Sequence, residues 1–237
     1  MMGTYVRYVQ QMGARVVPII REESDEVTLQ KLHKLNGVLM PGGDADYLEK
    51  GLFVFEQAKK INDAGKVFPI WGTCLGYENM VIYSASMGNA SLEVFGLHNV
   101  SLPLEFTKDP EATKMFSTWK AYGQNPHILS TSNMTWNSHS FSVRPSTFEK
   151  DEGLKNFWDV TSISRLDDNT PFVATIEAKK YPFFGVQFHP EQPSTQWIDN
   201  YGTNKTWASM QLNHMFGQHF LEIARSNNNT YGTFLET

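Results

Sequence analysis

The first half of the chain alternates between helical periodicity and short apolar runs. Four segments are predicted to be helices, at residues 5–12, 27–35, 47–64 and 77–83. Short runs rich in apolar side chains lie between them and predict strands at residues 15–20, 38–40 and 67–70. Helices that alternate with short, wholly apolar strands are typical of a parallel sheet covered on both faces. The pattern therefore predicts an α/β fold.

The pattern changes beyond Met87. The predicted elements of this half are strands within 92–106, a helix over 108–119 opened by Asp109-Pro110, a polar and aromatic segment over 133–143, paired strands over 172–177 and 183–188, and an amphipathic helix over 207–225. The sequence contains no repeat and no linker rich in Pro, Gly or Ser. We therefore expect one domain over residues 1–237.

Composition narrows the classes of function. Of the 237 residues, 41% are hydrophobic, which is enough for a full core, and the net charge is −5. A chain without a basic run is not expected to bind nucleic acid. No apolar run approaches the roughly 20 residues that cross a bilayer. We therefore expect a small-molecule substrate as the partner, with neither nucleic acid nor membrane involved.

Candidate chemistry first appears between the strand predicted at 67–70 and the helix after it. Gly72-Thr73-Cys74-Leu75-Gly76 is the G-x-nucleophile-x-G pattern of a nucleophile elbow, with cysteine in the place of serine. The two glycines allow a tight turn against neighbouring backbone. A helix N-terminus favours the thiolate, which is the attacking form of cysteine.

Cys74 is the only cysteine in the chain. It therefore belongs to no intrachain disulfide and to no cysteine metal cluster. The alternative interpretation is a small buried apolar residue, which is the usual role of a single cysteine.

Two further motifs follow predicted strands and so lie where active sites of such sheets are found. His189-Pro190-Glu191 ends the strand predicted at 183–188, and the i, i+2 spacing lets Glu191 orient the imidazole of His189. Pro41-Gly42-Gly43 follows the strand at 38–40, and its N–H groups could form an oxyanion hole with the N–H of Leu75. The alternatives are a solvated histidine and a plain turn.

These motifs carry a resemblance that spans nearly the whole chain. The elbow, the Pro-Gly-Gly loop and the segment Gly185-Val186-Gln187-Phe188-His189-Pro190-Glu191 resemble class I glutamine amidotransferase-like hydrolases. Among these, the Trp71-Gly72-Thr73-Cys74-Leu75-Gly76 form is similar to the γ-glutamyl hydrolase family, whose members act on folates. The resemblance implies a flavodoxin-like, mostly parallel sheet with helices on both faces. One departure is Phe188, because the family pattern has Trp before His-Pro-Glu.

The resemblance implies a mechanism without a cofactor or a metal. Cys74 would attack the γ-carbonyl of a glutamyl residue in a folate poly-γ-glutamate, as an omega peptidase does. The amides of Gly42, Gly43 and Leu75 would hold the oxyanion. His189 would protonate the leaving amine, and water would release the γ-glutamyl thioester.

Four further residues are implied by the same resemblance. Glu191 would orient the catalytic histidine. By position, His139 resembles a family histidine near the substrate, with Asn137 beside it, and Glu78 on the elbow helix could contact a substrate amino group. For His139 a purely structural role is an equal alternative.

Two other functions stay open at this level. One is a glutaminase domain that transfers ammonia to a synthetase, although nothing in the sequence resembles a synthetase module. The other is a non-catalytic binding protein on the same scaffold, which Cys74, His189 and Glu191 together disfavour. A homodimer is also compatible with the sequence.

Five N-x-Ser/Thr sequons are candidate glycosylation sites: Asn89, Asn99, Asn133, Asn204 and Asn228. They indicate the secretory route, and with the family resemblance they suggest a secreted, lysosomal or vacuolar protein. No signal peptide is visible in this sequence. The recognisable family pattern begins inside a predicted helix, whereas the resemblance implies a strand before that helix. We therefore expect the fold to lack its first strand. The alternative is that the strands predicted at 15–20 and 38–40 pair directly.

Overall fold

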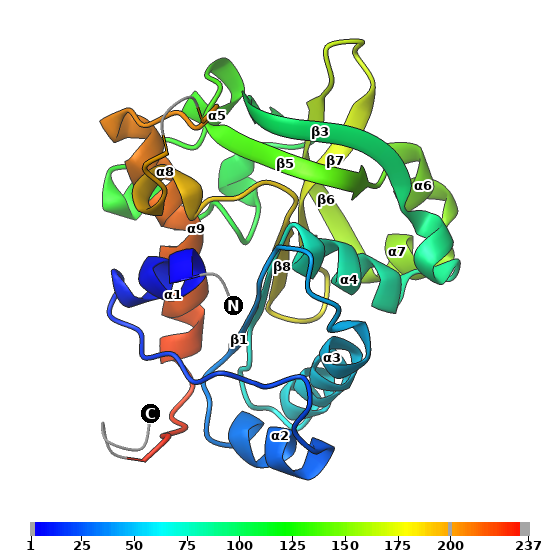
Figure 1. The fold of residues 1–237 in the computed structure, drawn as a ribbon, viewed down its shortest axis with the longest axis vertical. Coiled ribbons are helices and arrows are strands. Elements are labelled where there is room, and N and C mark those ends of the chain that lie inside the picture. Colours follow the sequence, from blue (N-terminus) through cyan, green and yellow to red (C-terminus); the bar gives the residue numbers. More distant parts are fainter. Residues whose placement is uncertain (1–2, 199–200, 233–237) are drawn as a thin grey trace.

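A six-stranded mixed sheet forms the centre of the computed structural model, which describes residues 3–198 and 201–232 (Figure 1). Its strands, in spatial order, are β1 (Val38–Met40), β2 (Ile70–Thr73), β8 (Phe183–Val186), β7 (Pro171–Ala178), β6 (Trp158–Arg165) and β4 (Glu105–Phe106). The first three are parallel, and the last three continue the sheet in antiparallel pairing. The expected α/β fold is thus confirmed, and its parallel part contains the strands that carry the candidate motifs.

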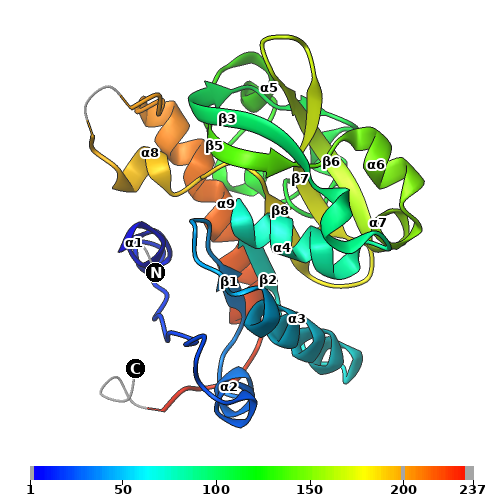
Figure 2. The same ribbon diagram turned by 45° about the vertical axis from the view of Figure 1, so that its right-hand side comes forward.

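Helices cover both faces of the parallel strands (Figures 1 and 2). On one face lie α1 (Gly3–Gln10) and α9 (Trp207–Arg225), and on the other lie α3 (Leu48–Asp63) and α4 (Leu75–Ser84). Strand β2 shows why, because Ile70 and Trp71 are both buried and point to opposite faces.

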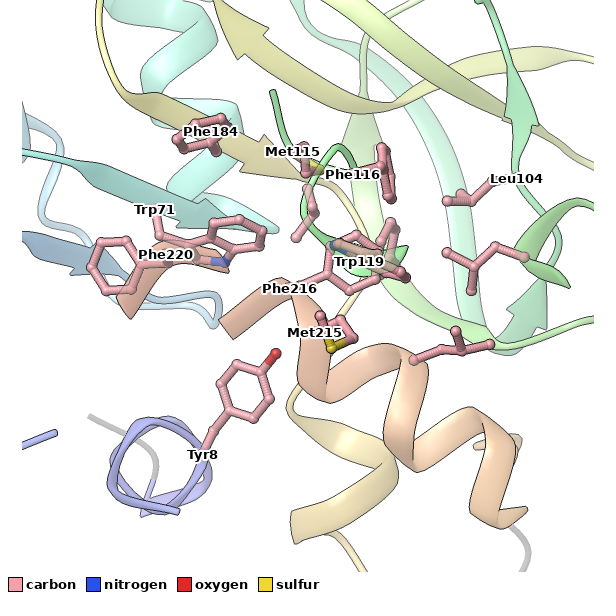
Figure 3. Close-up of a cluster of buried hydrophobic side chains, with 14 of the residues drawn as sticks. Tyr8, Trp71, Leu104, Met115, Phe116, Trp119, Phe184, Met215, Phe216 and Phe220 are labelled. Carbon is pink, nitrogen blue, oxygen red and sulfur yellow. The ribbon is translucent and has the colours of Figure 1, made fainter. Parts of the chain in front are cut away.

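The face covered by α1 and α9 holds a cluster of large aromatic side chains (Figure 3). Trp71 of β2 meets Phe216 and Phe220 of α9 at ring-centroid distances of 6.2 and 6.4 Å. Tyr8 anchors α1 to α9, since its hydroxyl donates to the carbonyl of Asn213 at 2.6 Å. Burial of such large rings is the main force that holds the helices on the sheet.

A second, two-stranded antiparallel sheet of β3 (Glu93–Leu102) and β5 (Thr135–Ser142) lies across the end of the main sheet where α4 begins (Figure 1). Two register irregularities bend this ribbon. The remaining helices are short: α2 (Asp25–Leu32), α5 (Ile128–Thr131), α6 (Pro145–Lys150), α7 (Glu152–Phe157) and α8 (Gln192–Thr195).

The strand predicted at residues 15–20 is not formed. A strand needs a neighbour for its backbone hydrogen bonds, and this segment pairs with no strand in the described part of the chain. Direct pairing with β1 is therefore not observed. Within residues 3–198 and 201–232, β1 is an end strand that pairs with β2 alone.

The prediction of a helix at residues 108–119 is also wrong. The segment forms two 3₁₀ turns instead, at Pro110–Ala112 and Trp119–Tyr122. The residues between them are fixed by tertiary contacts: the N–H of Met115 donates to the buried carboxylate of Glu177 at 3.0 Å, and Met115 and Trp119 are fully buried. The strand predicted at 67–70 begins instead at Ile70, because Pro69 has no N–H for the sheet.

Candidate active site

Cys74 stands between β2 and α4 with an unusual backbone conformation. Its φ of +51° and ψ of −111° are strained for a residue with a side chain, as at other nucleophile elbows. The flanking glycines are sterically required. A Cβ on Gly76 would collide with the carbonyl of Met40, and a Cβ on Gly72 would lie 2.8 Å from the backbone of Gly76. The predicted turn is therefore present, with the cysteine at its tip.

His189 and Glu191 are brought to Cys74 by the sheet. Strands β2 and β8 are parallel neighbours, so their carboxyl ends lie side by side, and the N–H of Cys74 donates to the carbonyl of Val186 at 2.9 Å. Nδ1 of His189 lies 2.8 Å from Oε1 of Glu191. His189 also lies beside Cys74, because a Cβ on Gly42 would come within 2.9 Å of both Cys74 Cβ and His189 Cε1.

The electrostatics of this histidine are set by its neighbours. Burial by itself would lower the pKa of His189, but the negative charges of Glu191 and Cys74 and their hydrogen bonds raise that pKa well above its ordinary value. The arrangement therefore favours a charged imidazolium next to the sulfur of Cys74, and this imidazolium can deliver a proton and later take one back.

The loop after β1 closes the site from a third side. A Cβ on Gly42 would come within 2.9 Å of both Cys74 Cβ and His189 Cε1, so only glycine fits there. Gly43 has a φ of +125°, which is also a glycine conformation. Leu75 opens α4, and the first N–H groups of a helix have no acceptor within the helix. Gly42 and Leu75, two of the predicted oxyanion residues, thus lie beside Cys74, and Gly43 follows Gly42 in the same loop.

Tyr5 is a member of the site that the sequence reasoning missed. Its hydroxyl accepts from the N–H of Gly42 at 2.9 Å and lies 3.1 Å from Nδ1 of His189. Tyr5 belongs to α1 and is 2% exposed, so from the sequence it was one of several apolar positions of a helix. No sequence signal separates it from Tyr8, which is equally buried but bonds to α9.

Glu78 lies in the first turn of α4 and is 6% exposed. Oε1 accepts from Nε2 of Gln187 at 3.0 Å. Burial raises the pKa of Glu78 to about 7, although the hydrogen bond from Gln187 and the charge of His189 act in the opposite direction. This carboxyl group therefore changes charge near neutral pH, in the same region as the catalytic candidates.

Asn137 and His139 lie on β5, next to the site but bonded mainly to their own strand. Nδ1 of His139 is 2.9 Å from the carbonyl of Phe141, and Nε2 is 3.3 Å from Oδ1 of Asn137. Burial lowers the pKa of His139 to about 3, so it is neutral at working pH. The strand reaches the nucleophile through the carbonyl of Ser138, which is 3.9 Å from Sγ of Cys74.

The described residues contain no group of three or more His, Cys, Asp or Glu side chains that could hold a metal ion. Among the same residues, no helix combines the length and apolar character needed to cross a membrane. Of the five sequons, Asn89, Asn99, Asn133 and Asn228 are exposed. Asn204 is partly buried, and its amide donates to the carbonyl of Asn133 at 2.9 Å.

Comparison with known proteins agrees with the geometry. Residues 3–208 match the family of class I glutamine amidotransferases. A solved structure described as a GMP synthase protein from Thermoplasma acidophilum superposes with a TM-score of 0.56 at 17% identity, covering 94% of this chain and 87% of that one, and thus shares the fold. The chain belongs to the class I glutamine amidotransferase family.

Within that family, the chain is similar to γ-glutamyl hydrolases of several organisms. The chain is 31% identical to γ-glutamyl hydrolase of Rattus norvegicus, over 99% of this chain and 74% of the rat protein. It is 31% identical to the human γ-glutamyl hydrolase, with 97% and 72% covered, and 30% identical to γ-glutamyl hydrolase B of Dictyostelium discoideum, with 98% and 67% covered. The protein is thus a member of the γ-glutamyl hydrolase group, as the resemblance of its motifs implied.

Proposed function

We propose that this protein hydrolyses the γ-glutamyl bonds of folate poly-γ-glutamates through a thioester on Cys74. The observation that carries the proposal is the position of Cys74 on a strained elbow, beside a histidine whose Nδ1 lies 2.8 Å from Oε1 of Glu191. A nucleophile, a base and an orienting carboxylate in this order are the elements of covalent acyl transfer.

In the proposed reaction, the thiolate of Cys74 attacks the γ-carbonyl carbon and the carbonyl electrons move to oxygen. Of the three amides expected to hold this oxyanion, those of Gly43 and Leu75 are the available donors, because the N–H of Gly42 already donates to the hydroxyl of Tyr5. The intermediate collapses, the C–N bond breaks, and His189 transfers its proton to the leaving amine. His189 then takes a proton from water, and the resulting hydroxide attacks the thioester carbonyl. The C–S bond breaks, Cys74 leaves as the thiolate, and the acyl fragment is released with a free γ-carboxylate on the glutamyl residue that was attacked.

The other residues of the site are proposed to contact the substrate. In a γ-linked chain the nitrogen next to each Cα belongs to an amide, so Glu78 would meet an N–H donor rather than a free ammonium group. As a carboxylate Glu78 accepts such a hydrogen bond, and its pKa of about 7 allows either form. Asn137 and His139 flank Ser138 of β5, whose carbonyl lies 3.9 Å from Sγ of Cys74, and they are proposed to contact the substrate.

The test is incubation with pteroyl-penta-γ-glutamate followed by mass analysis of the products. We expect loss of glutamate or of short γ-glutamyl peptides from the parent protein and no loss from the Cys74→Ala variant. Release of ammonia from free glutamine is the matched control, since a glutaminase would act on glutamine and leave the γ-linked chain intact. Intact substrate after prolonged incubation with folded protein would reject the proposal.

Localisation in a secreted, lysosomal or vacuolar compartment and use of the sequons are part of the same proposal. The exposed side chains of Asn89, Asn133 and Asn228 are the most accessible acceptors. The amide of Asn204 would have to give up its bond to Asn133 before it could be modified. Expression in a eukaryotic secretory host and a mass shift on enzymatic deglycosylation would show which sequons are occupied.

A further inference from the structure

We propose that Tyr5 is a positioning residue of the catalytic centre, whose hydroxyl ties the loop of Gly42 to the His189–Glu191 pair. The inference rests on the proposed function for its catalytic consequence. Its structural basis is independent of the substrate, because it depends only on contacts among residues of α1, the loop after β1 and the segment after β8.

The Tyr5 hydroxyl occupies the space between two parts of the site. Its oxygen accepts the N–H of Gly42 at 2.9 Å and lies 3.1 Å from Nδ1 of His189, which is itself 2.8 Å from Oε1 of Glu191. The fit is tight, because a Cβ on Gly42 would stand 2.6 Å from this oxygen. The ring of Tyr5 is 2% exposed, so the hydroxyl has little freedom to turn away.

The hydroxyl acts as a neutral group at any working pH. Burial raises the pKa of Tyr5 well above its ordinary value, and the negative charges of Glu191 and Cys74 raise it further. When Nδ1 of His189 carries its proton, both the Tyr5 hydroxyl oxygen, at 3.1 Å, and Oε1 of Glu191, at 2.8 Å, are acceptors within reach of that N–H. Both contacts stabilise the imidazolium in one orientation, with Nε2 facing Cys74.

The hydrogen bond from Gly42 to Tyr5 also determines which amides can bind the oxyanion. The N–H of Gly42 is already donated to Tyr5, so the N–H groups of Gly43 and Leu75 are the two that remain for the developing charge. Tyr5 thus fixes the position of the loop, and the oxyanion is assigned to the neighbouring amides.

The matched control is one helical turn away. Tyr8 belongs to the same helix and is 1% exposed, and its hydroxyl also makes two hydrogen bonds, accepting from the N–H of Gly217 at 2.9 Å and donating to Asn213. Those partners lie in α9, outside the site. Tyr5→Phe and Tyr8→Phe therefore remove the same atom from the same helix, and only one of the two changes affects the catalytic centre.

The first readout is alkylation of Cys74 by iodoacetamide between pH 5 and 9, which needs no substrate. The titratable groups around Cys74 are His189, Glu191, Glu78, His139, Tyr5 and Tyr47. Tyr5→Phe removes an acceptor from the imidazolium, so the midpoint of reactivity should move to higher pH by roughly 0.5 unit or more. Tyr8→Phe should retain the midpoint of the parent protein.

The second readout is turnover of the γ-glutamyl substrate. We expect Tyr5→Phe to lower kcat about 10-fold with KM within about 2-fold, because the hydroxyl acts on the chemical step and contacts no substrate. If Tyr5→Phe fails to fold, 3-fluorotyrosine at position 5 keeps the volume, weakens the acceptor and should shift the alkylation midpoint in the same direction.

An alkylation profile of Tyr5→Phe that overlays the parent profile would overturn the proposal. An equal shift in Tyr8→Phe would do so too, since the effect would then be structural. Failure of the proposed function is distinguishable: a parent protein that cleaves no γ-glutamyl bond ends that proposal, whereas the alkylation profiles still report on Tyr5.

Discussion

Two regions of the molecule each bury a histidine, and the two histidines behave in opposite ways. His189, beyond the carboxyl end of β8, and His219, on α9, are both 4% exposed. His189 lies beside Glu191, Tyr5 and Cys74, and these partners raise its pKa. Both ring nitrogens of His219 lack a hydrogen-bond partner among the described residues, and burial lowers its pKa to about 4.

The difference shows that partners, and not depth, decide what a buried imidazole can do. His219 packs edge-on against Phe184 with ring centroids 4.7 Å apart, within the aromatic layer under α9. In the described part of the chain no hydrogen-bond partner stabilises a charge on this ring, so the ring stays neutral and serves packing. At the end of β8 a carboxylate, a phenol and a thiol surround the ring and make the charged form the stable one.

Removal of the proposed nucleophile should have the largest effect on the site around His189. Cys74→Ala should abolish turnover of the γ-glutamyl substrate and leave the fold and substrate binding intact, because the elbow is formed by its glycines and not by the thiol. Steady-state kinetics and substrate binding by calorimetry measure the two effects. Residual turnover within about 10-fold of the parent, a barrier change of only ~1.4 kcal/mol, would contradict the nucleophile assignment.

Removing the charged histidine should have the next largest effect. His189→Asn should slow the chemical step by roughly 10²–10⁴-fold, the usual contribution of general acid–base catalysis. His214→Asn is the control, since His214 is a partly buried histidine of α9 outside the site, and it should have little effect. A much larger loss in His139→Asn than in His189→Asn would show that the roles of the two residues are reversed.

The raised pKa of Glu78 predicts how the stability of the folded protein depends on pH. Its pKa is raised from 4.5 to about 7 in the folded state, so the folded protein holds a proton that the unfolded chain has released between these values. The associated stability is complete below about pH 4.5 and is lost as pH rises through 7. Glu78→Gln keeps an acceptor for Gln187 and should be more stable than the parent at pH 8, relative to pH 5, by about 1–3 kcal/mol.

Urea unfolding at the two pH values measures this difference directly. Glu149→Gln is the control, because Glu149 is an exposed carboxylate on α6. Parallel pH dependence in Glu78→Gln and in the parent protein would show that the buried carboxyl does not titrate as described.

His219 provides the smallest expected effect. His219→Leu removes two unpartnered polar atoms from an apolar layer and should raise the free energy of unfolding by about 1 kcal/mol at pH 7. The advantage should grow as pH falls from 6.5 toward 4, because only the unfolded parent chain then gains a proton on this residue. Equilibrium unfolding measures it, with His33→Leu on the exposed end of α2 as the control. A destabilised His219→Leu variant would mean that the ring has a polar partner in solution.

Much of the site could be predicted because its signals are local. Strand β1, the elbow after β2 and the His-Pro-Glu segment after β8 each follow an apolar run, and parallel strands bring their carboxyl ends to one edge. The glycines were informative for a steric reason, since Gly42, Gly72 and Gly76 all stand where a Cβ would collide with a neighbour.

Other features depend on partners that are distant in the sequence. Residues 15–20 have strand-like composition but find no strand to pair with in the described structure, and Lys108–Trp119 is held in turns by contacts that include Glu177. Both predictions failed because propensity is a weak preference that tertiary contacts override.

The sequence by itself therefore determined the α/β class, the elbow around Cys74 and the pairing of His189 with Glu191, since each follows from side-chain pattern and spacing over a few residues. Only the tertiary structure decided that Tyr5 belongs to the site and Tyr8 to the core, and that His189 favours its charge while His219 loses it. The physical reason is that hydrogen bonding and charge stabilisation depend on distances between segments that are far apart in the sequence. Tyr5 and His189 are separated by 184 residues, and no local pattern encodes the contact between them.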